Sequence, residues 1–144
     1  MGRVFTISWP KFDKTVEAEM LEDQDPKLRQ DFWDALPFRS IQSHAVCAGV
    51  QMYCPFRLVS LPSQPSYEPM NEQPVGRVNL ELDFQYLAIN YGPMREPVPA
   101  LPIAQVKEND IRDIKIMGKM AWDNLLFSDE FLMVLFDKKE GAAE

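Results

Sequence analysis

Short runs of β-prone residues open the chain. In residues 15–21, Val16, Ala18 and Met20 alternate with glutamates. Alternation with a period of two is typical of a strand that buries one face. Residues 4–9 form a similar run just before it, so the two segments predict an opening hairpin.

The spacing of the apolar residues becomes helical after Asp25. Aspartate is a preferred N-cap residue, and a proline, here Pro26, suits the first helical position. Pro37 ends the pattern, because proline lacks a backbone donor and disfavours helix at the residue before it. The apolar residues between these two prolines are Leu28, Phe32, Trp33 and Leu36. They predict the first helix.

Most other apolar runs are also short enough to be strands. They cover residues 38–46, 50–53, 80–82, 86–90, 103–106 and 131–136. The last run has six consecutive apolar residues, which predicts a fully buried final strand. Before it, Ile111, Ile114 and Met117 recur at helical spacing. We expect Asn109 to cap this second helix and Gly118 to be the place where it could divide.

Proline marks the irregular parts of the chain. Nine of the twelve prolines lie in residues 55–102, and five of them punctuate residues 55–75. This predicts a long Pro-rich loop, a kind of segment that is often a lid or a binding loop, although a plain surface connection explains it equally well. A second Pro-rich segment, residues 92–102, predicts another loop because each proline removes a backbone donor.

The predicted elements are seven or eight strands and two helices, with most neighbouring strands joined as hairpins. This order predicts a mainly antiparallel β-barrel capped by helices. A β-sandwich with helices is the alternative. The 144 residues, 46% of them hydrophobic and 26% charged, are enough for one domain with a sizeable core, so we expect residues 1–144 to be a single domain.

Charge and hydropathy exclude several classes of partner. The net charge is −7, and the longest basic cluster is Lys138 with Lys139, so nucleic acid is not expected as a partner. The longest apolar run has six residues, whereas a membrane-spanning helix needs roughly 20, so no membrane partner is expected. The N-terminal residues 1–11 contain no apolar stretch long enough for a signal peptide, which predicts a cytoplasmic protein.

The cysteines suggest no metal chemistry. Cys47 and Cys54 are the only two, and they do not form a C-x-x-C pair. With a single histidine, His44, they cannot complete a zinc ligand set unless carboxylates join. We expect two buried thiols, no metal and no cofactor.

The order of several short motifs resembles a known family. The first helix runs into Leu-Pro-Phe-Arg-Ser at residues 36–40, a later strand runs into Tyr-Gly-Pro at residues 91–93, and Ile-Ala-Gln-Val follows at residues 103–106. This order resembles the small prokaryotic cyclophilin-like proteins of uncharacterised function, over residues 3–137. The resemblance implies a closed eight-stranded β-barrel with a helix over each open end and a cleft on its outer face.

The same resemblance suggests two binding residues. Cyclophilins proper are prolyl isomerases, in which an arginine and a nearby glutamine act on the X-Pro bond. Arg39 in the Phe-Arg step and Gln51 in the Gln-Met step resemble these residues, although the spacing between them is longer and the Gln-Gly-Gly-Asp-Phe segment is absent. A weak or lost prolyl isomerase is therefore one interpretation. Arg39 and Gln51 could also bind a carboxylate across a hairpin.

Three other side chains are candidates for chemistry. His44 can act as a general base near neutral pH, with a purely structural histidine as the alternative. Tyr91 and Arg95, on either side of a Gly-Pro turn, could present a hydroxyl and a guanidinium to an anionic ligand. By strand parity Arg39 faces away from His44, so these two are not expected to share a site.

Two functions follow from these residues. In the first, the domain binds or transforms a small organic acid or amide, with Arg39, Gln51 and Arg95 as substrate-binding residues and His44 and Tyr91 as catalytic residues. In the second, it is a non-catalytic protein-interaction module or subunit, for which a homodimer is the simplest assembly. Whether the protein is an enzyme is left open by the sequence.

Overall fold

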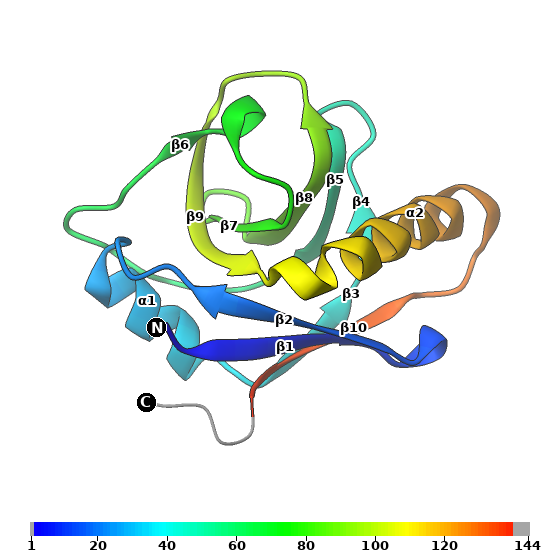
Figure 1. Ribbon diagram of the computed structural model, residues 1–144, viewed down its shortest axis with the longest axis horizontal. Coiled ribbons are helices and arrows are strands. Elements are labelled where there is room, and N and C mark those ends of the chain that lie inside the picture. The colour runs from blue at the N-terminus through cyan, green and yellow to red at the C-terminus, as the bar shows by residue number, and fades with distance from the viewer. Residues whose placement is uncertain (1, 140–144) are drawn as a thin grey trace.

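The computed structural model describes residues 2–139, and the order of its elements follows the hydrophobic pattern. The strands are β1 (Val4–Trp9), β2 (Lys14–Met20), β3 (Phe38–Ile41), β4 (Ser43–His44), β5 (Gly49–Pro55), β6 (Glu68–Pro69), β7 (Arg77–Glu81), β8 (Tyr86–Met94), β9 (Pro99–Val106) and β10 (Met133–Lys138). The helices are α1 (Pro26–Asp34) and α2 (Ile111–Phe127), with short 3-10 helices η1 (Pro10–Phe12), η2 (Met70–Glu72) and η3 (Glu108–Asp110). Figure 1 shows their arrangement.

The strands form one antiparallel sheet that nearly closes into a barrel. Its order is β3-β10-β1-β2-β9-β7-β8-β5-β4, with β6 paired to β9 outside this path. The two ends of the order, β3 and β4, are halves of one segment, residues 38–44: β3 pairs with β10, and β4 pairs with β5. If this segment is counted as one strand and the two-residue β6 is left out, eight strands form the barrel. The predicted mainly β barrel with two helices is confirmed, and the β-sandwich is not what forms.

The opening hairpin builds one wall of the barrel core. The β1–β2 register pairs Phe5 with Ala18 and Ile7 with Val16, and all four side chains are fully buried. Because side chains alternate along a strand, the polar residues between them face outward. The predicted hairpin is therefore confirmed.

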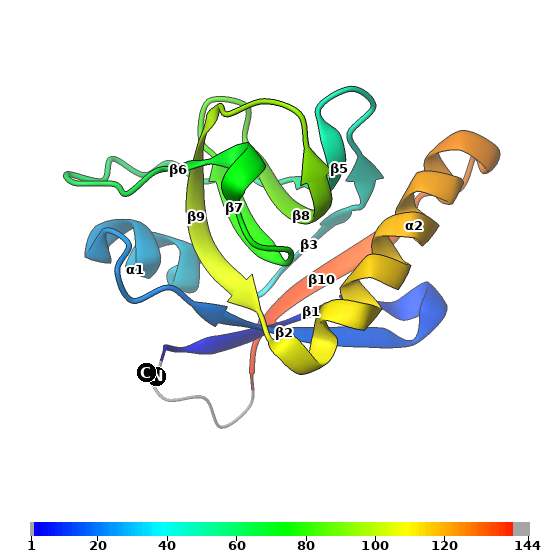
Figure 2. The same cartoon turned by 45° about the horizontal axis from the view of Figure 1, so that its top comes forward.

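Helix α1 begins where the sequence predicts. One carboxylate oxygen of Asp25 accepts hydrogen bonds from the backbone N–H groups of Lys27 and Leu28, at 2.9 and 3.1 Å. This satisfies two donors that a helix N-terminus otherwise leaves unpaired. The buried face packs against the barrel, with the Phe32 ring centroid 5.2 Å from that of Phe5. Figure 2 shows α1 beside the barrel, at the far side of the molecule from α2.

Helix α2 differs from the prediction at its start and in its middle. It begins at Ile111 after η3, and the residue at its N-cap is Asp110 rather than Asn109. The Asp110 carboxylate makes no cap; it accepts a hydrogen bond from the backbone N–H of Glu17 at 2.8 Å. The helix also continues through Gly118 instead of dividing there, and the missing side chain at this position leaves room for the ring of Tyr91.

The segment predicted as a second loop is mostly strand. β8 continues to Met94 and β9 begins at Pro99, so only residues 95–98 connect them. The prolines are tolerated because they lie where the ladder is irregular or ends. Pro102 follows a register shift between β7 and β9, and Pro99 pairs only with the two-residue β6. The expectation of a loop over residues 92–102 was wrong, because prolines at such positions do not prevent strand formation.

The last strand is buried on one face only. In β10, Val134 and Phe136 are buried, whereas Met133 and Leu135 are each 38% exposed. Within residues 2–139, no element fully covers the outer face of β10. The apolar run therefore does not mean that both faces of the strand are buried. The expectation of a fully buried final strand was wrong.

The thiols also differ from the expectation. Cys54 is buried in the core, and burial raises the pKa of its thiol to about 12. Cys47 lies in the turn before β5 and is exposed, so only one of the two thiols is buried.

The long Pro-rich segment is largely irregular, as predicted, but it is tied down. It contains only β6 and η2 as regular elements. The side chain of Gln24 bonds to it twice: its amide nitrogen donates to the Ser66 carbonyl and its oxygen accepts from the Ser66 N–H, at 3.0 and 2.9 Å. Among residues 2–139, no helix is long and apolar enough to cross a membrane.

Candidate functional site

The structure brings the two predicted catalytic residues into contact. His44 on β4 and Tyr91 on β8 are joined by a hydrogen bond of 2.5 Å between the histidine Nε2 and the tyrosine hydroxyl. The other ring nitrogen, Nδ1, lies 2.7 Å from the carbonyl oxygen of Ala45. A carbonyl can only accept, so Nδ1 carries a proton. In the neutral ring Nε2 is then an acceptor, and the Tyr91 hydroxyl donates to it.

The surroundings of this pair favour its neutral form. His44 is 6% exposed, and burial lowers its pKa below the ordinary value of 6.5. Burial raises the pKa of Tyr91 above its ordinary value of 10.0, and the negative charge of Asp123 raises it further. The Trp122 ring lies over the imidazole, with ring centroids 4.8 Å apart. Both side chains are therefore uncharged near neutral pH.

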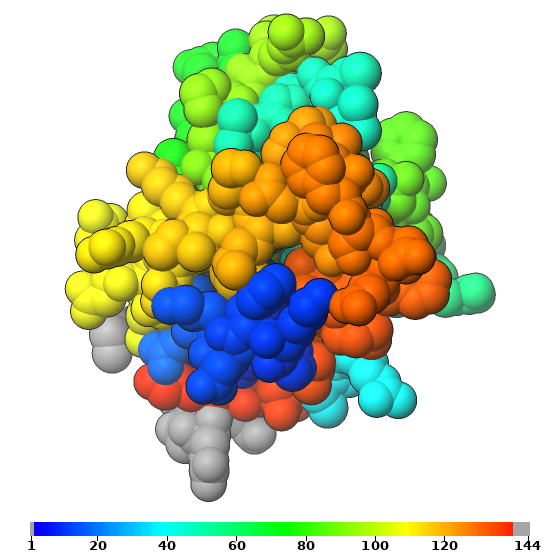
Figure 3. All heavy atoms as spheres, turned by 90° about the vertical axis from the view of Figure 1, so that its right-hand side faces the viewer, coloured from blue at the N-terminus to red at the C-terminus, as the bar shows by residue number. Residues whose placement is uncertain are grey.

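Helix α2 fixes the ring of Tyr91. A Cβ atom at Gly118 would lie 2.3 Å from two ring carbons of Tyr91, which is far inside van der Waals contact. The ring therefore rests directly on the backbone of the helix. Figure 3 shows α2 crossing this face of the molecule between the turn of the first hairpin, in blue, and the β4–β5 region, in cyan.

Tyr91 lines a cavity of about 500 Å³, which we call the η2 cavity. The residues that line it come from η2, the segment after it, β5, β8 and α2; they are Val50, Met70, Asn71, Gln73, Val75, Tyr91, Gly92, Pro93, Met94 and Lys115. Its size is that of sites for small organic molecules, and its walls combine apolar side chains with a few polar groups. Four of the lining residues belong to residues 55–75, so the end of the Pro-rich segment forms one wall.

The charge of this lining favours an anionic group. Among the residues that line the η2 cavity, Lys115 is the only charged one. Lys115 lies on α2 and is exposed. An ammonium group with no carboxylate among its neighbours in the lining attracts an acid.

A network of buried amide side chains lies next to the η2 cavity. Asn79 on β7 is fully buried, and Asn90 on β8 is 2% exposed. Both bond to the side chain of Gln73, which is also part of the cavity lining. The predicted binding residue Gln51 belongs to this network, because its amide nitrogen donates to the Asn90 side-chain oxygen at 2.8 Å.

Sequence reasoning missed Asn79, Asn90 and Gln73. The available signal was an asparagine inside each of two apolar strands, in Val-Asn-Leu at residues 78–80 and Ile-Asn-Tyr at residues 89–91. A buried polar side chain needs a partner, so such positions indicate a polar network. Gln73 carried no comparable signal, because it lies between prolines in an irregular segment.

Arg39 and Gln51 do not lie together. The backbone N–H of Ala45 bonds to the Gln51 carbonyl at 2.9 Å, so Gln51 lies opposite residue 45. Arg39 is six residues earlier, which is about 20 Å along an extended chain. Its side chain is exposed and it pairs with Leu135 on β10, whereas Gln51 is buried. The structure therefore does not bring together the arginine and glutamine that a prolyl isomerase or a shared carboxylate site requires. Arg39 and His44 also have different surroundings, as expected from strand parity.

Arg95 lies near the η2 cavity but lines a neighbouring hollow of about 250 Å³. That hollow also contains Cys47 and Glu96, and Met70 lines both spaces. Arg95 is exposed, and its backbone N–H bonds to the carbonyl of Ala48 at 3.1 Å.

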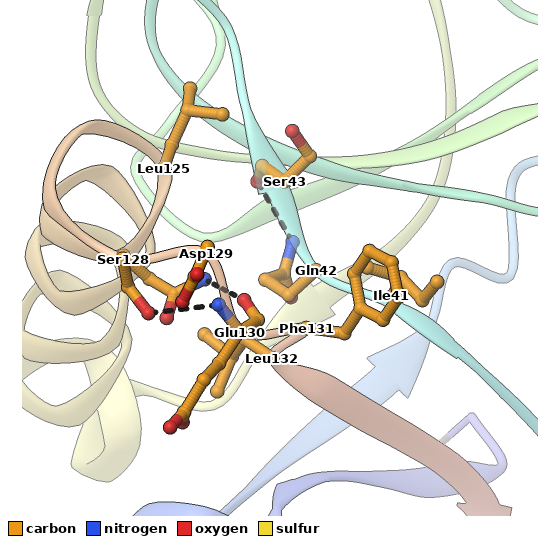
Figure 4. A pocket seen from close by; sticks show the side chains of 10 residues that line it. Ile41, Gln42, Ser43, Leu125, Ser128, Asp129, Glu130, Phe131 and Leu132 are labelled. Carbon is orange, nitrogen blue, oxygen red and sulfur yellow. Dashed lines mark hydrogen bonds between the residues drawn. The ribbon is translucent and has the colours of Figure 1, made fainter.

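A separate hollow of about 250 Å³ lies where α2 ends, and we call it the α2-end hollow. Figure 4 shows the side chains of Ile41, Leu125 and Phe131 around it, together with polar contacts from Gln42 to Ser43 and between Glu130 and Ser128. Phe131 is 75% exposed and Leu125 is 41% exposed. Exposed apolar side chains therefore lie here beside polar residues that include Asp129 and Glu130.

The described residues offer no obvious metal site. Within residues 2–139, no three His, Cys, Asp or Glu side chains are grouped so that they could hold an ion. The polar side chains that line the η2 cavity include the Tyr91 hydroxyl, the Gln73 amide and the Lys115 ammonium group, and the His44 imidazole bonds to Tyr91.

Sequence comparisons identify no relative. Neither a scan against models of known protein families nor a search of curated proteins gave a match.

The fold resembles that of known structures, as two examples show. The structure of McbB in complex with tryptophan matches 97% of this chain with a TM-score of 0.82 and 28% sequence identity. The match covers 46% of McbB, so this chain spans just under half of that protein's length. A solution structure of the hypothetical protein AF2241 from Archaeoglobus fulgidus matches 95% of each chain, with a TM-score of 0.57 and 12% identity. These neighbours support a barrel-like fold, and the cyclophilin-like resemblance stays a prediction.

Proposed function

We propose that this barrel binds a small organic acid or amide with an apolar body, such as an aromatic amino acid, in the η2 cavity. The observation that carries the proposal is the composition of that cavity: apolar walls from Val50, Met70 and Met94, with Lys115 as its only charged lining residue. An apolar body would bury against the methionines, and its carboxylate would pair with the ammonium group.

The comparison with McbB agrees with this ligand class. The McbB structure contains tryptophan, which combines a carboxylate with an aromatic ring. The resemblance covers 97% of the present chain. Because the chain spans less than half of McbB, the likeness supports a binding site of this kind and not a particular reaction.

Tyr91 and His44 give the site a means of moving a proton. The Tyr91 hydroxyl donates to the neutral His44 Nε2, so the imidazole can take the hydroxyl proton as the tyrosine oxygen takes a proton from a bound ligand. The Ala45 carbonyl holds the imidazole in the tautomer that this transfer needs. If the protein is an enzyme, these are the residues that we propose for its proton-transfer step.

Calorimetric titration with L-tryptophan and with indole-3-acetate tests the proposal. We expect both to bind, and Lys115→Gln to weaken binding by about tenfold, the size of a lost charge pair at a partly exposed site. Lys119→Gln is the matched control, since Lys119 is on the same helix, pairs with Asp123 and is not part of the cavity lining. Absence of binding by either compound, or equal losses in the two variants, would contradict the proposal.

A protein-interaction role is the second candidate, and the α2-end hollow is the observation that favours it. Exposed apolar side chains line it from β3, α2 and the segment between α2 and β10, namely Ile41, Leu125 and Phe131, and the exposed Phe127 and Met133 are close to them in sequence. Apolar surface of this kind is typical of protein-binding sites. A second copy of the chain is the simplest partner, and light scattering over a range of concentrations would detect it. A monomer at all concentrations would remove the homodimer.

A further inference from the structure

The side chain of Gln73 uses its full hydrogen-bonding capacity. Its oxygen accepts from the Nδ2 atoms of Asn79 and Asn90, at 2.8 and 2.7 Å. Its nitrogen donates to the Oδ1 of Asn79 and to a carboxylate oxygen of Glu68, at 2.8 and 3.0 Å. A primary amide has two donors and two acceptor lone pairs, so all four are satisfied here.

Two of the three groups that bond to the Gln73 side chain also have other partners. Asn79 and Asn90 lie on paired central strands, and the Asn90 oxygen accepts from Gln51. The Glu68 carboxylate is bound by the Arg77 guanidinium through two hydrogen bonds, at 2.8 and 2.7 Å. The Asn79 side chain bonds to Gln73 alone among the described residues, and its burial on β7 restricts its position. With Asn90 and Glu68 held by other partners, the three groups form a largely preorganised receptor for an amide.

Gln73 itself comes from a less regular part of the chain. It follows the single turn of η2 and precedes Pro74, at the end of the long Pro-rich segment. Its side chain also lines the η2 cavity, together with Met70. A ligand in that cavity would therefore touch Gln73, and displacement of Gln73 would open the cavity onto Asn79 and Asn90.

We propose that Asn79, Asn90 and Glu68 form a binding subsite for primary amides, which the Gln73 side chain occupies until a ligand amide displaces it. The inference rests on the proposed function, because the ligand enters through the η2 cavity. The inference goes beyond the proposed function because it names the chemical group, a primary amide, that the inner end of the cavity recognises.

The hydrogen-bond pattern determines which groups fit this subsite. Gln73 and Asn79 exchange two hydrogen bonds, so the ligand needs a donor and an acceptor on one edge. A lactam or cyclic ureide supplies that edge but lacks the second N–H of a primary amide, which here reaches Glu68. A carboxylate supplies no donor and would face the Asn79 oxygen and the Glu68 carboxylate. The subsite therefore selects primary amides over acids.

Chemical rescue of the Gln73→Ala variant tests the subsite. The substitution removes the side-chain amide and leaves its partners unpaired. We expect propionamide at high millimolar concentration to raise the Tm of this variant by at least about 2 °C, and propionate to have no such effect. Gln64→Ala is the control, because Gln64 is an exposed residue of the same segment whose only recorded bond is made by its backbone. A folded Gln73→Ala variant that responds equally to both compounds, or to neither, would overturn the proposal.

The wild-type protein provides a second measurement that does not depend on the variant's folding. In an NMR titration, benzamide should move the side-chain NH₂ signals of Gln73 towards their solvent-exposed positions and should bind at least about tenfold more tightly than benzoate. Equal binding of the two compounds with unchanged Gln73 signals would overturn the subsite and leave ligand binding by the η2 cavity intact. If benzamide, benzoate and L-tryptophan all fail to bind, the proposed function fails, and the subsite with it.

Discussion

Two hollows border α2, and they differ in how much exposed apolar surface they present. The η2 cavity, near Lys115, adjoins several amide side chains that are buried and bonded to one another. The α2-end hollow has one buried amide, Gln42, which bonds to the Trp9 indole and to two carbonyls, and most of its other lining residues are exposed, including Ile41, Leu125 and Phe131. Fixed polar groups beside an apolar wall can recognise a small molecule, whereas exposed apolar surface alone favours contact with another protein.

Because of this difference, substitutions in the two regions should have different consequences. A buried asparagine needs its partners, because an unpaired buried amide has an unfavourable free energy. An exposed phenylalanine side chain requires no partner within the fold, because it has no polar group to satisfy. Substitutions in the first region should therefore affect stability, and substitutions in the second should affect association.

Removal of a buried amide should have the largest effect. Asn79→Ala leaves Gln73 without two of its hydrogen bonds, and we expect it to lower the free energy of unfolding by about 2–3 kcal/mol. Asn124→Ala is the counterpart in the α2-end hollow; its side chain makes one exposed bond to the Glu130 carbonyl, and the expected loss is below about 1 kcal/mol. Urea denaturation measures both, and equal losses would remove the distinction between the two regions.

A methyl group at Gly118 should have the next largest effect. In Gly118→Ala the new Cβ overlaps the Tyr91 ring, so the ring or the helix must move, at an expected cost of about 1–3 kcal/mol. The movement would weaken the bond between Tyr91 and His44, and the near-ultraviolet circular dichroism of tyrosine should change. Lys119→Ala, at the next and exposed position, is the control. An unchanged spectrum and unchanged stability in Gly118→Ala would contradict the close packing.

A smaller effect is expected in the pH dependence of stability, because His44 is the only histidine that can contribute to it. Burial lowers its pKa in the folded state below the ordinary 6.5, so below that pH the unfolded chain binds a proton that the folded chain does not. The free energy of unfolding therefore falls as the pH drops from 6.5 towards the folded pKa, and the contribution is complete above 6.5. His44→Gln should flatten this part of the curve in denaturation experiments. Identical slopes for the variant and the wild type would show that His44 does not titrate in this way.

A change at the exposed apolar surface should have the smallest effect on folding. Phe131→Ser should alter the free energy of unfolding by no more than about 0.5 kcal/mol, because the ring is 75% exposed. If the α2-end hollow mediates self-association, the same substitution should abolish it, as measured by light scattering. A large loss of stability in the monomer would mean that this ring contributes to the core after all.

The sequence predicted most of the fold because strands and helices here follow local rules. The alternation in β2 and the Asp25-Pro26 start of α1 needed no knowledge of the rest of the chain. Predictions failed where a distant element decided the outcome. Gly118 was expected to weaken a helix, and only the position of Tyr91 explains why glycine stands there.

The candidate site was predicted in part for a similar reason. His44 and Tyr91 stand out by their chemistry, and the structure joins them. Arg39 and Gln51 also stand out, but the register between β4 and β5 separates them. The amides around Gln73 could not be found from the sequence alone, because their pairing depends on how the Pro-rich segment folds back onto β7 and β8.

The most direct test of ligand binding in the η2 cavity is an NMR titration of the wild-type protein with L-tryptophan, followed through backbone amide signals. The account predicts saturable shifts confined to residues around the cavity, such as Val50, Gln73, Gly92 and Lys115. The absence of saturable shifts, or shifts that gather instead around Ile41, Leu125 and Phe131, would contradict it.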